Sequence, residues 1–305
     1  MGLVTIVSAP IVYWRLDDDI RSARFLTEEE RLQGVERLRA NQTGASTNKF
    51  IWSHIWEIIL EPKSWLWLVM AWLPNMGSAM TSIFGPLIIK GLGFDRYITS
   101  LLNIPFGAVQ TIVILAACWA STYVKLKSAV LLAFMVPVVA GTGMLYGLDH
   151  TDTSNQGALL AAYYLCAFLF AGNPLLLSWA VGNTSGTTKK SVTLSLYQAG
   201  LSAGDIVGPL MFSDDQAPNY RPGTAGVLGI FVALICSIII QVAILVLLNK
   251  SQSKKRVRNG KSAVIVDQSM QNTVNSGGKV GEHVVDESDN LDLTDRQNDE
   301  FVYIY

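Results

Sequence analysis

Charged residues are scarce in this 305-residue sequence, where Asp, Glu, Lys and Arg make up 15% and hydrophobic residues 50%. Most of the charge lies in residues 15–63 and 250–305, and long apolar stretches lie between them. Soluble proteins do not leave so much apolar sequence without charge breaks, so the composition indicates a polytopic membrane protein. The formal net charge of −1 indicates no nucleic-acid partner.

Cysteine is also scarce, with three residues, and each lies in a different apolar stretch: Cys118, Cys166 and Cys236. There is no CxxC pair and no Cys/His cluster, so we expect buried apolar packing rather than disulfides or a metal site. No phosphate-binding loop, metal-ligand spacing or nucleophile elbow occurs. The sequence therefore predicts neither an enzyme nor a cofactor.

Six apolar stretches are long enough to cross a bilayer, which takes roughly 20 helical residues for a ~30 Å hydrocarbon core. They are residues 64–89, 99–122, 128–148, 156–182, 192–212 and 224–249. A membrane β-barrel is excluded because its strands are ~10 residues long with alternating polarity. We expect an all-α integral membrane protein with a six-span domain over residues 64–249. Its many Gly, Ala and Ser residues let helices approach closely in lipid.

The basic residues predict the orientation. Residues 15–63, 123–127, 183–191 and 250–261 hold eighteen Lys and Arg, whereas the alternate connections hold three. Positive charge marks the cytoplasmic side, so the first loop and the tail are both predicted to be cytoplasmic. The Asn-x-Ser/Thr sequons at Asn41 and Asn183 would then lie in cytoplasmic segments and remain unglycosylated.

The residues before the six spans form two predicted parts. Residues 1–14 are apolar but interrupted by Pro10 and too short to cross, and we interpret them as the end of a preceding span. In the loop 15–63, Thr27 and Glu30 predict a capping box, and Leu32, Val35 and Leu38 then recur at helical spacing.

A second helix is predicted near the end of this loop. One of its faces would carry four isoleucines, Ile51, Ile55, Ile58 and Ile59. Trp52 and Trp56 suit the lipid headgroup layer, and His54 is expected to be an interfacial residue rather than a ligand.

The tail, residues 250–305, is polar and predicted to be disordered. Its basic start, KSQSKKRVR, would lie against anionic lipid. A trafficking or regulatory role for the tail remains open.

Two asparagines beside prolines predict a site near the bilayer midplane. The six spans divide into three plus three, so the first and fourth correspond, and these carry Asn75 next to Pro74 and Asn173 next to Pro174. Both asparagines lie roughly 15 Å from the cytoplasmic end of their span, so they could face one cavity. Alternatively, each Asn–Pro pair only kinks its helix and bonds to a neighbour. Further candidates for substrate contact are Gln110, Tyr197 and Gln198.

The fifth span contains Asp205, the only Asp, Glu, Lys, Arg or His in the six spans. Gly200, Gly204 and Gly208 recur every four residues and form one smooth helical stripe on which a second helix can pack. Asp205 lies beside this stripe. A carboxyl group at this depth is either protonated and hydrogen-bonded at a helix contact or couples transport to protons or substrate. We expect the first of these.

Several motifs in order resemble a known family. FLTEEE at 25–30, ERLRANQTG at 36–44 and the tryptophan-rich stretch 52–67 resemble the central loop and seventh span of the fungal allantoate permease family. That family belongs to the anion:cation symporters of the major facilitator superfamily. The similarity continues through LLNIPFGAVQ, NTSGTTKKSV, GDIVGPLMFSDDQAPNYRPG and DLTDRQNDEF, and covers about Phe25 to the C-terminus.

The resemblance implies spans seven to twelve of a twelve-span fold, with residues 1–14 ending span six and the N-terminal half absent. It implies proton-coupled uptake of small organic anions, such as ureides, vitamins or short peptides, across the plasma membrane. Similar proteins usually carry Gly-Asn where this sequence has Gly204-Asp205, which favours the hydrogen-bonding interpretation of Asp205. Partners would be the lipid bilayer, an organic anion, protons and a separate N-terminal half.

Two other functions compete with transport by this chain. A non-transporting membrane protein could pair with or regulate a full carrier, or the chain could be an inactive fragment. A seven-helix receptor would need residues 1–14 as a span, but that segment is too short and the following loop unusually long.

Overall fold

The computed structural model describes residues 2–15, 17, 23–31, 50–85, 96–150, 152–213, 216, 219–262 and 292–305. The chain divides into two compact units. Unit 1 comprises Met1–Thr47 and Val266–Leu293, and unit 2 comprises Asn48–Ile265 and Thr294–Tyr305.

Unit 1 contains helix α1, Gly2–Arg15, which includes Pro10. The predicted capping box is present. The backbone N–H of Thr27 donates to the Glu30 carboxylate at 2.9 Å, and the backbone N–H of Glu30 donates to the Thr27 hydroxyl at 3.4 Å. These reciprocal bonds satisfy two donors at a helix start. Leu32, Val35 and Leu38, on which the rest of this helix was predicted, lie outside the described residues.

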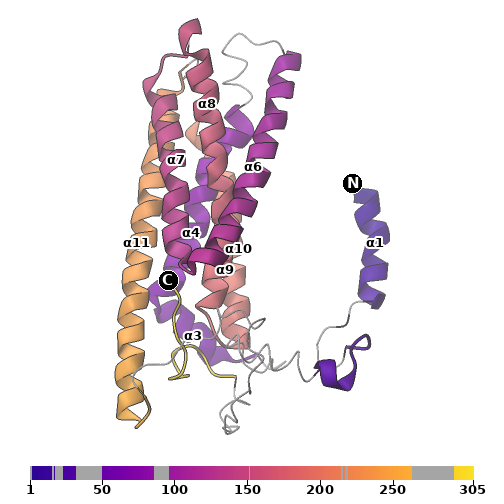
Figure 1. Ribbon diagram of the computed structural model, residues 1–305, viewed down its shortest axis with the longest axis vertical. Coiled ribbons are helices and arrows are strands. Elements are labelled where there is room, and N and C mark those ends of the chain that lie inside the picture. Colours follow the sequence, from indigo (N-terminus) through magenta and orange to yellow (C-terminus); the bar gives the residue numbers. More distant parts are fainter. Residues whose placement is uncertain are drawn as a thin grey trace. The chain divides into compact units, whose positions relative to one another are not determined.

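Unit 2 is a bundle of long helices (Figure 1). A short helix α3, Trp52–Leu60, precedes α4, Pro62–Ala79, which continues into a π-helical turn, η2, Met80–Phe84. Next come α6, Arg96–Val124, and α7, Lys127–Gly147. A 3₁₀ turn, η3, Thr153–Asn155, leads into α8, Gln156–Cys166; another, η4, Ala167–Ala171, joins α8 to α9, Gly172–Gly182. The last are α10, Thr187–Val207, the 3₁₀ turn η5, Gly208–Met211, and α11, Arg221–Arg258.

The predicted all-α membrane class is confirmed. All regular elements among the described residues are helical, and four helical segments are long and apolar enough to cross a membrane: Ser100–Val124, Lys127–Gly147, Gln156–Gly182 and Arg221–Arg258. The two other predicted spans correspond to α4 with η2 and to α10 with η5, which are helical but fall outside this apolar set. A bundle that faces lipid outside can place its less apolar helices on inner surfaces.

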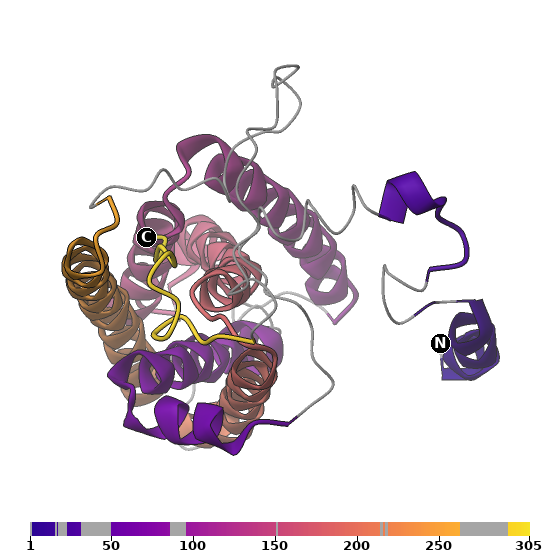
Figure 2. The same ribbon diagram turned by 90° about the horizontal axis from the view of Figure 1, so that it is seen from below.

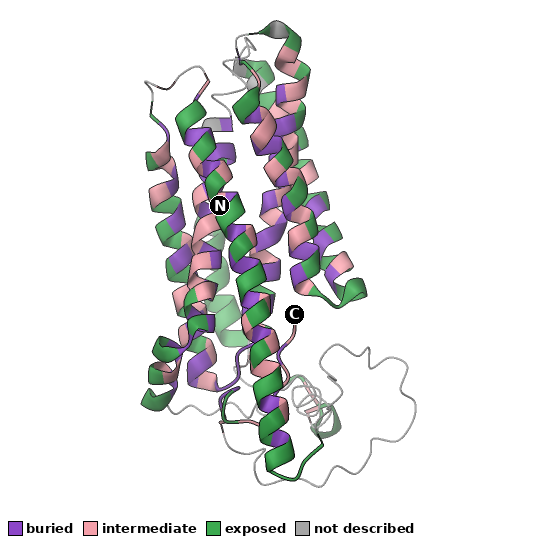
Figure 3. Cartoon of the chain, turned by 90° about the vertical axis from the view of Figure 1, so that its left-hand side faces the viewer, coloured by how far each residue is buried: buried purple, intermediate pink, exposed green. Residues whose placement is uncertain are grey.

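The core of unit 2 takes buried side chains from all its long helices, including α4, α6, α7, α8, α9 and α11. Trp67 of α4 and Trp179 of α9 are buried and meet edge to face, with ring centroids 5.0 Å apart. Phe231 of α11 packs over Gly77 of α4, where a Cβ atom would lie 2.3 Å from the Phe231 ring. Exposed residues follow the outer faces of the helices (Figure 3). Apolar side chains on these faces suit contact with lipid or with another helical domain.

The structure corrects three sequence-based expectations. Helix α11 continues to Arg258, and Thr294–Tyr305 folds against the bundle, so the prediction of a disordered tail is wrong for these two parts. Residues 263–291 lie outside the described residues. Cys166 is buried as expected, but Cys118 and Cys236 are exposed on the outer faces of their helices. His54, expected to be an interfacial residue, is buried, as is Ile58 among the isoleucines predicted on one face of the same helix.

Candidate substrate site and ion-pair network

The stripe of Gly200, Gly204 and Gly208, in α10 and at the start of η5, lies directly on α4. A Cβ atom added at Gly200, Gly204 or Gly208 would lie 2.7, 2.6 or 2.6 Å from the backbone oxygen of Leu68, Trp72 or Met76, respectively. The contacting residues are four apart on both sides. Successive turns of the glycine stripe therefore contact successive turns of α4. Such backbone approach is possible only where side chains are absent.

This close packing brings Asn75 to a junction of three helices. A Cβ atom at Gly204 would lie 2.8 Å from Asn75 Cβ. Asn75 Nδ2 donates to Asn173 Oδ1 of α9 at 3.4 Å, and Asn173 Nδ2 donates back to Asn75 Oδ1 at 3.5 Å. The Tyr197 hydroxyl of α10 donates to the Asn173 backbone oxygen at 3.2 Å. The structure thus brings together the two asparagines that the sequence placed at one depth.

The amide pair retains capacity to bind a ligand. Each side-chain amide has two donor hydrogens and one acceptor oxygen. Asn75 also donates to the backbone oxygen of Ala71 at 2.9 Å. The two bonds between the amides are at or beyond the long end of the usual range, and Asn173 is only half-buried. A polar ligand could therefore replace these bonds without leaving a strong hydrogen bond unmade.

The other sequence-predicted contact residues are more scattered. Gln110 is half-buried on α6, and Gln198 is exposed on α10. Neither has a hydrogen-bond partner within the part of the chain that the structure describes. Tyr197 is 1% exposed and joins the site through its bond to Asn173. The amide pair and Tyr197 therefore form the candidate site of this chain.

Asp205 lies outside this junction. It is exposed on α10, and it has no hydrogen-bond or ion-pair partner among the described residues. The expected hydrogen-bonded carboxyl at a helix contact is therefore wrong, because Gly204 faces α4 and the next residue, about 100° further around the helix, faces away. Asp205 belongs to a surface of α10 that no described part of unit 2 covers.

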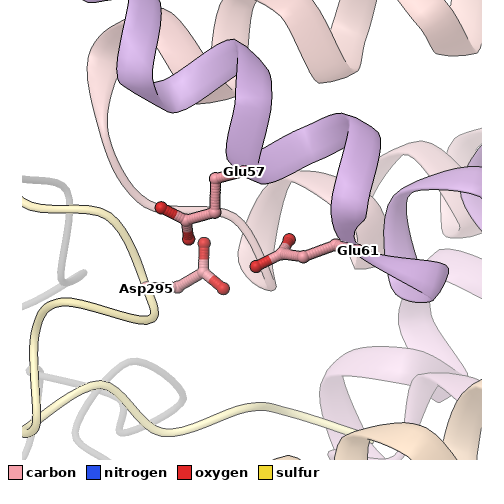
Figure 4. Close-up of side chains that lie close together, drawn as sticks. All are labelled: Glu57, Glu61 and Asp295. Carbon is pink, nitrogen blue, oxygen red and sulfur yellow. The ribbon is translucent and has the colours of Figure 1, made fainter.

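A second polar cluster lies at the opposite end of α10, outside the spans. Lys189 is fully buried and contacts three carboxylates: Glu57 at 2.6 Å, Glu61 at 2.9 Å and Asp295 at 2.8 Å. Lys63 of α4, 1% exposed, pairs with Asp295 and lies 3.6 Å from Glu61. We call these five residues the ion-pair network. Its three carboxylates come from α3, the α3–α4 junction and the end of the chain (Figure 4).

Burial and charge together determine the ionisation of the network. Burial alone would raise the pKa of Asp295, but the charges of Lys63 and Lys189 hold it well below its ordinary value. Burial alone would lower the pKa of Lys189, but the charges of Asp295 and Glu61 raise it. Burial, opposed by the charge of Lys63, raises the pKa of Glu61.

Both a sufficiently low pH and a sufficiently high pH would weaken the network, each through a different residue. The stability contributed by Asp295 is present above its unfolded pKa and is lost as the pH falls through the lowered folded value. That contributed by Lys189 is present below its unfolded pKa and is lost as the pH rises through the raised folded value. Both contributions are intact at neutral pH.

The three carboxylates have the spacing of a cation site, with ligand atoms within 4.8 Å of one another. The ammonium groups of Lys63 and Lys189 lie among them and already supply the positive charge. We therefore interpret the cluster as ion pairs rather than as a metal site.

Sequence reasoning missed this network. Lys63 and Lys189 counted only as cytoplasmic charges, and Asp295 as part of a disordered tail. His54, expected at the lipid interface, is 2% exposed, and its ring lies 3.3 Å from the position of a Cβ atom on Gly186. One signal was available: the polar tail ends in FVYIY, and such apolar residues are expected to bury themselves against the protein.

The fold defines an integral membrane protein, with long apolar helices and a polar amide pair between them. Its curated relatives include transporters. The chain is 31% identical over 256 residues to MFS-type transporter cnsL of Penicillium expansum, covering 83% of this chain and 52% of that protein. It is 29% identical over 232 residues to thiamine pathway transporter THI73 of Saccharomyces cerevisiae, covering 75% and 43%.

A third relative is uncharacterized transporter C757.13 of Schizosaccharomyces pombe, 29% identical over 300 residues, with 96% of this chain and 52% of that protein covered. The chain thus spans about half the length of the curated relatives it matches. No protein-family model and no solved structure matches it.

Proposed function

We propose that the chain is the C-terminal half of a major facilitator transporter of the allantoate permease branch, which carries a small organic anion across the membrane together with protons. The observation that carries this proposal is the hydrogen-bonded pair of Asn75 and Asn173. They lie on α4 and α9, which correspond to the first and fourth predicted spans, in a chain whose relatives are named transporters. Transporter sites commonly lie near the midplane between corresponding helices of two repeats.

The charge of this half supports coupling to a cation. Its six predicted spans hold no Lys, Arg or His, so the amide pair offers neutral donors to an anion. Bringing an unpaired anion to membrane depth is costly. The compensating charge must come from a co-transported proton or from the other half of the carrier.

Uptake by reconstituted halves tests the proposed function. We expect the 305-residue chain alone to give no coupled uptake, because alternating access needs two halves that move about a shared site. Co-expression with the N-terminal six-span half of a relative should restore accumulation of a radiolabelled anion from a panel that includes allantoate. The matched control pairs the chain with the N-terminal half of an unrelated facilitator. Accumulation by the chain alone, or none with any related half at normal surface levels, would contradict the proposal.

The proposed orientation places both the loop before α4 and the end of α11 in the cytoplasm. The basis is the excess of Lys and Arg in those connections. Single cysteines introduced at the exposed positions Phe50 and Lys261, in a chain without Cys118, Cys166 and Cys236, should react with a membrane-impermeant maleimide only after the cells are permeabilised. Labelling of either position in intact cells would refute this topology.

Asp205→Asn is expected to leave folding unchanged, because the Asp205 side chain makes no described contact and is exposed. In a two-half carrier we expect transport to persist as well, since similar proteins usually carry Asn at this position. The measurement is surface expression together with uptake as a function of external pH. Normal expression with loss of proton-driven accumulation would make Asp205 a coupling residue.

A further inference from the structure

The C-terminal segment Thr294–Tyr305 belongs to unit 2 and lies across the ends of its helices (Figure 2, yellow). At its first end, Asp295 is fully buried in the ion-pair network. The neighbouring Thr294 hydroxyl donates to the Glu57 carboxylate at 2.9 Å. Gln252 of α11 donates to the Asp295 backbone oxygen at 2.7 Å. One short stretch thus contacts α3, α4, α10 and α11.

Two asparagines of the bundle form hydrogen bonds with the C-terminal end of the segment. Asn183, after α9, donates to the Ile304 backbone oxygen and accepts from the Ile304 backbone N–H, both at 2.9 Å. Asn249 of α11 does the same for Tyr303, at 2.7 and 2.9 Å. Hydrogen bonds to the main chain of a bound peptide supply affinity in peptide recognition. Trp179 of α9 adds a bond to the Ile304 oxygen at 2.9 Å.

Two aromatic side chains give the segment a buried anchor. Phe301 and Tyr303 are 2% and 1% exposed and pack edge to face, with centroids 5.0 Å apart. The Tyr303 hydroxyl donates to the Asp295 carboxylate at 2.8 Å, and the Lys63 ammonium lies 4.8 Å from the Tyr303 ring centroid. Buried aromatic anchors with a charge-assisted hydrogen bond are typical of high-affinity interfaces.

The charges of the bundle and of the segment are compatible with dissociation of the segment. Without it, Lys63 and Lys189 still face Glu57 and Glu61, two positive and two negative groups. The segment brings Asp295 together with Arg296, which lies 3.8 Å from Glu61. Release therefore leaves a network of balanced charge, which avoids the large cost of an uncompensated buried charge.

We propose that the cytoplasmic ends of α3, α4, α9, α10 and α11 form a peptide-binding site, and that Thr294–Tyr305 is its releasable ligand, an internal latch held by Asp295 and Tyr303. While docked, the latch ties these helix ends together, so relative movement of the ends requires its release. The binding claim is independent of the proposed function, because it concerns one half alone and its test measures no transport.

The test uses the full chain, purified in detergent, with a protease site inserted within residues 263–291. After cleavage, the C-terminal fragment should remain with the bundle through gel filtration. An excess of synthetic Thr294–Tyr305 peptide should displace it, whereas the same peptide with Asn at position 295 should not. In the chain, Asp295→Asn should shorten the half-life of the cleaved complex at least about 30-fold, as expected when one partner of a buried ion pair is removed.

Glu300→Gln is the matched carboxylate-to-amide control. Glu300 pairs with Lys261 at an exposed position, with 57% and 40% of the side chains accessible, so its loss should change the half-life less than about threefold. Immediate loss of the fragment on cleavage would show that these contacts do not hold it. Failure of any peptide excess to displace it would show that the segment is an inseparable part of the fold. Either result overturns the proposal, and both are measured with the cleaved chain that carries no substitution.

Discussion

Gly204→Val should strongly destabilise the bundle, whereas Gly229→Val should not. A Cβ atom at Gly204 would lie 2.6 Å from the Trp72 backbone oxygen and 3.0 Å from the Met76 backbone nitrogen. Backbone atoms of a packed helix cannot rotate away, so α4 and α10 would have to separate. Overpacking of this kind costs about 3 kcal/mol, roughly a 100-fold change in the folding equilibrium.

Gly229 is the matched control for this substitution. It also lies within a long membrane helix, α11, but a Cβ atom there would meet nothing within 4 Å. Both variants introduce the same side chain and remove the same backbone freedom. The measurement is the yield of monodisperse detergent-solubilised chain and its melting temperature. Equal behaviour of the two variants would contradict the described contact between α4 and α10.

Asn75→Leu and Asn173→Leu should each weaken transport by a two-half carrier more than they weaken folding. Loss of a hydrogen bond to a charged ligand costs about 1.5–3 kcal/mol, which predicts a rise in KM of roughly tenfold to a hundredfold. The bonds lost within the protein are the long ones between the two amides, together with the Asn75 bond to Ala71, so melting should change modestly. Initial uptake rates over a range of substrate concentrations give KM, and surface expression gives the folded amount.

Asn103→Leu serves as the control for this pair. Asn103, on α6, accepts a hydrogen bond from the Tyr163 hydroxyl at 3.0 Å, so its removal also costs an asparagine contact. It makes no described bond to Asn75 or Asn173. We expect a similar change in melting temperature with an unchanged KM. An equal rise in KM for all three variants would show a general packing effect rather than a site.

The helices and the pairing of Asn75 with Asn173 could be predicted from the sequence because their signals are local or periodic. Apolar runs predicted α6, α7 and the α8–α9 span to within three residues of their observed ends. The spacing of Gly200, Gly204 and Gly208 indicated a helix contact, although not that α4 is the partner. Counting residues from the span ends placed Asn75 and Asn173 at one depth, where the structure shows them hydrogen-bonded.

The ion-pair network could not be predicted in this way. Lys63 pairs with Asp295, which lies 232 residues away, and no pattern near either residue identifies the other. The polar composition of the tail also concealed its short aromatic end, whose burial offsets the cost of ordering the segment. The prediction for Asp205 was wrong for a different reason. Its position along the helix was predicted, but the face of α10 on which it lies depends on which helix packs against Gly204.

The central claim is that Asn75 and Asn173 form one substrate site, and a double-mutant cycle on KM tests it most directly. The measurement compares uptake by a two-half carrier with Asn75→Leu, Asn173→Leu and both substitutions, each normalised to surface expression. If both amides hold the same substrate group, the double variant should raise KM by clearly less than the product of the two single effects. Independent, multiplicative effects, or an unchanged KM in either single variant, would contradict the account.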